Sequence, residues 1–187
     1  CAWRNLLSRI LLSMGDAPGA LAHAEAGIAL AADPALRSRL GPLRMRQARA
    51  LSALGRPAEA LAAGEAARAL ASELGSPAEA VKADAARAEA LLARAEAGDI
   101  ELALRLSQAE AEILGHSDAG GAPLEYPLWT SLMMIRALAA AGDPRALEAS
   151  RIAVETLRAR AARITDPGMR RGFVDDVPEH AALQRLF

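Results

Sequence analysis

A short pattern that occurs four times along the chain constrains its fold more than any other feature. In each copy a glycine is followed by a polar residue and, a few positions later, by an Ala-Leu pair. The copies are Gly15-Asp16 with Ala20-Leu21, Gly55-Arg56 with Ala60-Leu61, Gly98-Asp99 with Ala103-Leu104, and Gly142-Asp143 with Ala146-Leu147. The Ala-Leu pairs lie 40, 43 and 43 residues apart. A near-constant period of this length is typical of a repeat array in which each unit packs on its neighbours.

The residues between the glycines predict helices. Hydrophobic residues make up 52% of the 187 residues and aromatic residues only 3%, and alanine, the strongest helix former, is abundant. Apolar spacing and Gly/Pro punctuation predict helices over about 2–14, 18–32, 35–54, 57–74, 77–97, 100–114, 128–141 and 145–164, then two short ones after Asp166-Pro167 and over 179–186. Gly41-Pro42 predicts a kink or a helix start, because proline disrupts a helix interior. Asp16 and Ser76 are expected N-caps.

Residues 116–123 form the one long segment without periodicity and contain two glycines and a proline. This composition predicts an irregular loop. The segment is interpreted as a longer connector, with a recognition loop as the alternative, since loops often carry function.

Charge and cysteine content narrow the class of protein. With 22 basic and 23 acidic residues the net charge is −1, which argues against a nucleic-acid-binding surface. No apolar run is long enough for a transmembrane helix. The single cysteine, Cys1, excludes an internal disulfide, so a cytoplasmic protein is expected. Because the chain starts within a helical pattern and without methionine, we interpret it as a piece of a longer protein.

The repeated unit resembles the tetratricopeptide repeat. In that family a pair of antiparallel helices turns at a small residue, small residues recur where the helices cross, and proline often follows the second helix. The matching positions here are Gly15, Ala20 and Pro34; Gly55, Ala60 and Pro77; Gly98 and Ala103; Gly142 and Ala146. The period exceeds the family's usual length, and most of its large aromatic residues are replaced by alanine, leucine or glycine.

The end of the chain, from Asp166-Pro167 through Arg171, Phe173 and Val177-Pro178 to His180, resembles the close of repeat regions in large bacterial regulators. In these a kinase, a nucleotide cyclase or an ATPase-linked DNA-binding regulator precedes the repeats. The resemblance implies a parent multidomain protein with its catalytic parts upstream.

The expected fold is therefore all-α: a right-handed solenoid of four tetratricopeptide-like helix pairs with a C-terminal cap. The expected repeat boundaries are about 1–34, 35–76, 77–123 and 124–165, with capping helices over 166–187. The last pair of a solenoid needs a cover for its apolar face. Apolar residues of the tail that can supply it are Phe173, Val174, Val177, Leu183, Leu186 and Phe187.

No residue pattern typical of an enzyme was identified. His23, His116 and His180 are far apart and lack partners at metal-ligand spacing. There is no phosphate-binding loop and no nucleophile elbow. Carboxylates such as Glu73, Glu79, Asp84 and Glu89 are interpreted as solvated helix faces, and Met133-Met134 beside Trp129 as core. We expect no cofactor, no metal and no catalysis by this chain.

Candidate binding residues come from aligning the first helix of each pair on its glycine. Arg9, Arg49 and Arg136 lie six residues before the glycine, and Leu92 takes this position in the third pair. Asn5, Met45, Ala88 and Leu132 lie four residues earlier still. First helices line the concave face of such arrays. One hypothesis is a groove whose arginines bind a carboxylate-bearing segment; the other is ordinary surface arginine covering Ala-rich helices.

The predicted function is a protein-interaction or scaffold module of a larger bacterial signalling or transcriptional regulator. Its partner would be a protein or peptide segment, or upstream domains of its own chain, with no role for nucleic acid or membrane. The family's Lys/Asn clamp for a peptide terminus is not reproduced, which disfavours a chaperone-tail adaptor. The alternative is a structural spacer or a self-association module that forms a homo-oligomer.

Overall fold

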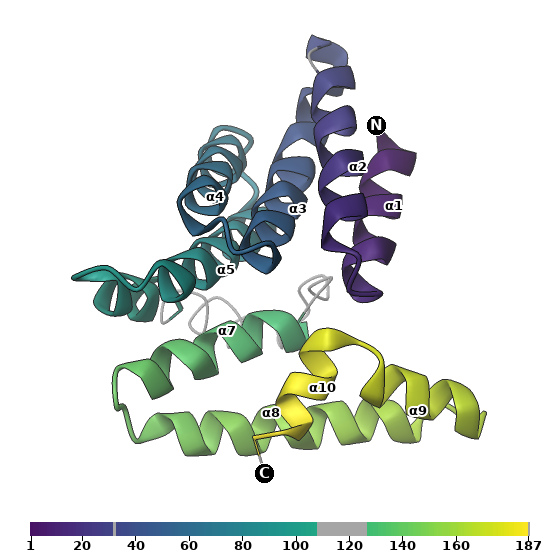
Figure 1. The fold of residues 1–187 in the computed structure, drawn as a ribbon, viewed down its shortest axis with the longest axis vertical. Coiled ribbons are helices and arrows are strands. Elements are labelled where there is room, and N and C mark those ends of the chain that lie inside the picture. Colours follow the sequence, from purple (N-terminus) through teal and green to yellow (C-terminus); the bar gives the residue numbers. More distant parts are fainter. Residues whose placement is uncertain (32, 108–126, 187) are drawn as a thin grey trace.

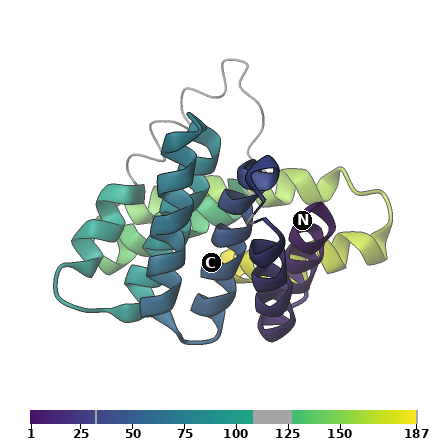
Figure 2. The ribbon, with the colours of Figure 1, turned by 90° about the horizontal axis from the view of Figure 1, so that it is seen from above.

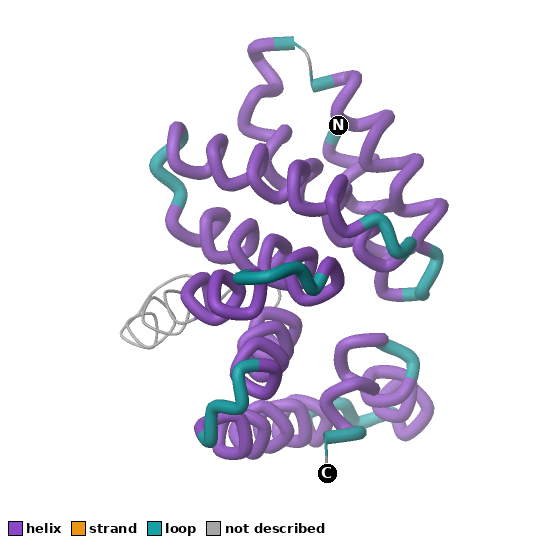
Figure 3. Tube along the Cα trace, turned by 60° about the vertical axis from the view of Figure 1, so that its left-hand side comes forward, coloured by secondary structure: helices purple, strands orange, loops and turns teal. Residues whose placement is uncertain are grey.

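The described part of the protein is built entirely of helices. A computed structural model describes residues 1–31, 33–107 and 127–186 (Figures 1 and 3). The helices are α1 (Ala2–Ser13), α2 (Ala17–Leu30), the 3₁₀ helix η1 (Pro34–Arg39), α3 (Leu40–Ala53), α4 (Pro57–Glu73), α5 (Pro77–Arg94), α7 (Pro127–Ala140), α8 (Arg145–Ala162), α9 (Pro167–Asp175) and α10 (Pro178–Gln184). Another helix covers residues 99–107. This confirms the all-α class.

Two predictions fall partly or wholly outside these ranges. The predicted helix over 100–114 is described only to residue 107, and the predicted loop over 116–123 lies outside the described residues. None of the helices described combines the length and the apolar character needed to cross a membrane.

The repeated glycines turn the chain as predicted. Gly15, Gly55, Gly98 and Gly142 have φ angles of +78°, +70°, +86° and +67°, a left-handed conformation that glycine adopts without steric cost. Asp16 caps α2 by accepting a hydrogen bond from the Gly19 N–H at 2.9 Å. Ser76 stands at the N-cap of α5, but its side chain makes no capping hydrogen bond.

Two helix boundaries differ in detail from the sequence prediction. The run over 35–54 divides into η1 and α3, so Pro42 lies in the first turn of α3, where its missing N–H costs nothing. Helix α5 ends at Arg94 instead of near Ala97. There the nearly buried Asp99 carboxylate accepts hydrogen bonds from the Arg94 guanidinium at 2.7 and 2.9 Å and from the Glu96 N–H at 2.9 Å, which holds the chain in an earlier turn.

The helices pack both within and between consecutive pairs. α1 packs on α2, α3 on α4, and α7 on α8, while α3 also contacts α1, α5 contacts α3, and α7 contacts α5 (Figures 1 and 2). Each odd-numbered helix from α1 to α5 therefore lies against the next odd-numbered helix. Ala20, Ala60 and Ala103 are fully buried, which permits close approach of their helices.

The fourth copy of the pattern behaves differently. Ala146 is only half-buried and Leu147 is 70% exposed. Gly142 and Ala146 are one residue closer together than the glycine and alanine of the other copies, and one residue rotates a helix position by about 100°. The expectation that Ala146 marks a helix crossing is therefore wrong; Ala153, Val154 and Leu157 supply the buried face of α8.

The C-terminal tail covers the last helix pair only in part. α10 contacts α7 and α8, Leu183 is fully buried in the core cluster, and Phe173 packs partly buried against that cluster. α9 has no buried residue, and Leu186 is 41% exposed. Phe187 lies outside the described residues. The tail also turns inward, so that α10 reaches the surface formed by α3, α5 and α7.

Candidate functional site

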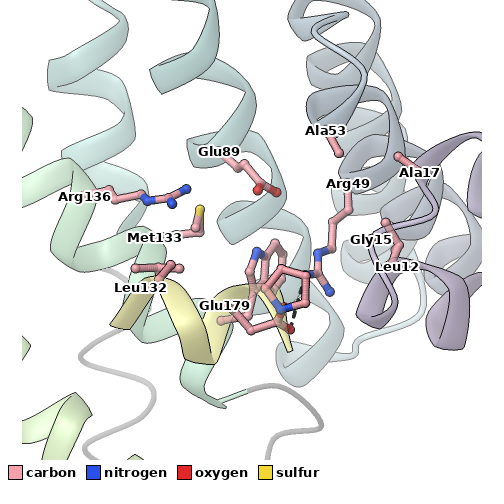
Figure 4. Close-up of a pocket in the computed structure, with 13 residues that line it drawn as sticks. Leu12, Gly15, Ala17, Arg49, Ala53, Glu89, Leu132, Met133, Arg136 and Glu179 are labelled. Carbon is pink, nitrogen blue, oxygen red and sulfur yellow. Dashed lines mark hydrogen bonds and ion pairs between the residues drawn. The ribbon is translucent and has the colours of Figure 1, made fainter. Parts of the chain in front are cut away.

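A cavity of about 190 Å³ lies where α3, α5, α7 and α10 meet (Figure 4). Charged side chains enter it from four helices, and apolar side chains form the remaining walls. The lining residues that carry chemistry are Arg49, Glu89, Arg136 and Glu179, and the principal apolar ones are Leu12, Trp129, Leu132, Met133 and Ala182. We call this the central cavity.

Arg49 holds a carboxylate in the central cavity. Its Nη2 atom lies 3.5 Å from Oε1 of Glu179, and both side chains are only 10% exposed. The guanidinium carbon lies 4.2 Å from the ring centroid of Trp129, which is 2% exposed. A guanidinium over an indole face is attracted to the ring and keeps its N–H groups at its edge for an anion. The indole thus fixes the orientation in which Arg49 meets Glu179.

Glu89 brings a second carboxyl group to the same cavity. Its Oε2 atom is buried and has no hydrogen-bond partner in the part of the chain that the structure describes. Burial raises the pKa of Glu89, the positive charges of Arg49 and Arg136 oppose this, and the negative charge of Glu179 adds to it. Figure 4 shows Glu89 directed from α5 between Arg49 and Arg136. The interpretation of Glu89 as a solvated carboxylate is therefore wrong, because α7 and α10 cover it.

The Trp129 indole N–H is a further buried group without a satisfactory partner. The indole nitrogen lies close enough to the Glu89 carboxyl to lower the pKa of Glu89 slightly. The two groups nevertheless do not meet the geometry of a hydrogen bond. The central cavity thus contains a buried acceptor and a buried donor that lie close together without a hydrogen bond between them. Buried polar groups are normally paired, and these two are near enough to pair with each other or with a bound group.

Arg136 extends the site toward solvent. It is exposed, and it lines both the central cavity and an adjoining hollow of about 480 Å³ that also includes Ser52, Leu92 and Ala140. Among the described residues it makes no hydrogen bond or ion pair. The two hollows share Ala53, Glu89, Met133 and Arg136, so a ligand in either one meets the charged groups of Glu89 and Arg136, whereas Arg49 and Glu179 line only the central cavity.

The structure brings together four of the seven residues proposed from the sequence. Arg49, Leu132 and Arg136 line the central cavity, and Leu92 lines the adjoining hollow. Asn5 and Arg9 lie apart from them on α1, in a separate hollow of about 210 Å³ with Arg39 and Pro42. Met45 is 2% exposed and packs in the core, so it offers a partner no surface.

Sequence reasoning missed Glu89, Trp129 and Glu179 as site residues. Glu89 lies three residues before Leu92, so it shares a helix face with a proposed residue, and this spacing was a usable signal. Glu179 is 130 residues from Arg49, and no local pattern links them.

Other polar side chains in the described ranges do not assemble a reactive centre. No three His, Cys, Asp or Glu residues there are close enough to hold a metal ion. Nδ1 of His180 lies 2.6 Å from the Phe173 carbonyl oxygen, and the two rings are 4.5 Å apart. These contacts join α9 to α10 and so serve the shape of the tail.

Comparison of the chain with protein-family models, with curated proteins and with solved structures finds no match.

Proposed function

We propose that this chain is a protein-interaction module, a right-handed solenoid of tetratricopeptide-like helix pairs that binds a carboxylate-bearing segment of a partner on the surface of α3, α5 and α7. The packing of α1, α3, α5 and α7 in succession and the left-handed glycines between paired helices support the repeat architecture. The resemblance of the sequence to repeat regions of bacterial regulators supports a place in a larger cytoplasmic signalling or transcriptional protein.

The observation that carries this proposal is the Arg49–Glu179 contact in the central cavity. A carboxylate on a short helix is bound there by a guanidinium that rests on Trp129. The surface therefore accommodates an acidic helical segment. Arg136 supplies a second guanidinium on the solvent side, where it is accessible to a partner's carboxylate. Guanidinium groups such as those of Arg49 and Arg136 are suited to bidentate recognition of carboxylates.

The first test is a screen of immobilised acidic 12-residue peptides against the full chain, followed by titration of the tightest binder. Arg136→Glu is expected to weaken its binding at least tenfold, because a bidentate contact becomes a repulsion. Arg158→Glu, on the exposed side of α8, makes the same charge change away from the site and should leave the affinity unaltered. Equal affinities of wild-type and Arg136→Glu chains would reject the proposed surface.

The alternative function, a spacer or self-association module, has its own supporting observation. Trp3, Leu7 and Ile10 of α1 and Met14, which follows its last residue, are 77%, 40%, 43% and 73% exposed. Their spacing of three and four residues puts them on one helix face. Such a stripe is suited to contact with another molecule.

A further inference from the structure

Helix α10 occupies part of the proposed binding surface in the manner of a ligand. Glu179 meets Arg49, Ala182 lines the central cavity, and Leu183 is fully buried in the core cluster. Glu179 and Leu183 are four residues apart and so share one face of the helix. One turn of α10 thus presents a carboxylate to Arg49 of α3 and a small residue and an apolar anchor to the side of the molecule where α10 contacts α7 and α8.

Among the residues that the structure describes, few side chains of the tail are fully buried. α9, which precedes α10, has no buried residue, and Leu183 is the one fully buried residue of α10. The Arg49–Glu179 distance of 3.5 Å is longer than that of a close charge-assisted hydrogen bond. Segments with few buried contacts open at a small cost in free energy, so the tail is suited to exchange with a competitor.

We propose that the partner of this surface is a short helix with a carboxylate in its first turn and a leucine one turn later, and that α10 competes with it for the same place. The inference rests on the proposed function and specifies its ligand. In the closed state Glu179 satisfies Arg49 from within the chain. In the open state the partner's carboxylate takes that position, its leucine replaces Leu183, and α9–α10 swings away from α7.

Charge complementarity limits what the partner presents. Glu89 lies close enough to Glu179 for the negative charge of Glu179 to add to the raised pKa of the buried Glu89 carboxyl. A helix with a second acid in the next turn would bring a further negative charge toward Glu89. The neutral face after Glu179, with Ala182 and Leu183, avoids this. We therefore expect one acid followed by small and apolar residues on the contact face.

The test uses the chain's own tail as the probe. A fluorescein-labelled peptide with the sequence of residues 177–187 is titrated by fluorescence anisotropy into the full chain and into its Glu179→Arg variant. The variant loses the internal contact and turns it into a repulsion, so it should bind the peptide at least tenfold more tightly than the wild type does. Asp175→Arg is the matched control, because this exposed residue of the same tail makes the same charge change outside the cavity.

A charge swap identifies the site of binding. Arg49→Glu should abolish binding of the native peptide and should favour a peptide in which the glutamate is replaced by arginine. Glu179→Gln, a milder release of the tail, should give an intermediate affinity, and circular dichroism of each variant reports whether the helical fold is retained. Equal affinity of wild-type and Glu179→Arg chains, or binding insensitive to Arg49→Glu, would overturn the competition.

The two proposals fail in different ways. If acidic peptides from the screen bind through Arg136 and Glu179→Arg does not change their affinity, the surface is a binding site but α10 does not compete for it. If Glu179→Arg admits the tail peptide while no screened peptide binds, the tail is the surface's own occupant and the external partner is rejected.

Discussion

Glu89 is the residue whose environment departs furthest from the sequence expectation. An acid with a raised pKa favours folding while it is protonated and opposes folding once it is ionised. Its contribution is therefore lost as pH rises from the ordinary carboxyl range through the raised pKa of Glu89. Glu89→Gln keeps the shape and removes the ionisation. We expect the free energy of unfolding of this variant to exceed that of the wild type by roughly 1–3 kcal/mol at pH 8, because the amide avoids the cost of desolvating a negative charge.

The measurement is urea denaturation of both chains between pH 5 and pH 8. The difference between them should grow with pH. Glu65→Gln, at an exposed position of α4, is the control and should show no such growth. A constant difference between wild type and Glu89→Gln across this range would mean that Glu89 does not change its ionisation on folding.

The sequence predicted individual site residues only where helices could be aligned with one another by their distance to a repeated glycine. The repeat register identified Arg49, Leu92, Leu132 and Arg136, because their positions follow from the distance to a glycine. It could not identify the burial of Glu89, which depends on how α7 and α10 pack over α5. It also placed Asn5 and Arg9 with the others, although the hollow that they line is a separate one.

At the level of helices, the close approach of α2 to α3 depends on Gly27. A Cβ atom there would lie 2.6 Å from Cδ2 of Leu43, which is fully buried, and 3.2 Å from Cβ of Arg4. Overpacking of this kind lowers the free energy of unfolding by about 1–3 kcal/mol. The better helix propensity of alanine raises it by about 1 kcal/mol. Gly27→Ala should therefore lower the free energy of unfolding by about 1 kcal/mol.

Gly41 in α3 provides the comparison for that substitution. The nearest atom to a Cβ there is Cβ of Leu70 at 3.9 Å, an ordinary contact. Gly41→Ala should raise the free energy of unfolding by about 0.4–1 kcal/mol, chiefly by restricting the unfolded chain. Denaturant midpoints of the two variants should shift in opposite directions. A stabilising Gly27→Ala would show that Leu43 can move aside.

The helices themselves were predictable because their signals are local. Glycine, proline and capping aspartate mark the boundaries within a few residues, as at Gly15-Asp16 and at Asp166-Pro167. The departures have longer-range causes. α5 ends early because Asp99 binds Arg94 across the turn, and Ala146 misses the helix crossing through a single-residue change in spacing.

For the molecule as a whole, the same helix face is exposed on α1 and buried on α3. Moving forward by 40 residues, the interval between the first two Ala-Leu pairs, takes Trp3 to Leu43 and Ile10 to Ala50, which are both fully buried. Leu43 is buried against α2, the helix before it. On α1 the equivalent face is exposed and carries larger apolar side chains. A second copy of this chain could cover that face with its own α1 stripe.

If the chain self-associates through this face, sedimentation velocity should show a concentration-dependent dimer. Leu7→Glu should weaken dimerisation at least tenfold, because it introduces a charge into the apolar stripe. Leu74→Glu, at a similarly exposed leucine outside α1, should not.

The two tryptophans give a second measurement of this association, since Trp3 is 77% exposed and Trp129 only 2%. Acrylamide should quench the fluorescence of Trp3 in dilute solution. The quenching should decrease as the dimer forms, because the partner chain then covers Trp3. A chain that stays monomeric at every concentration, with Trp3 equally quenched throughout, would exclude self-association through α1.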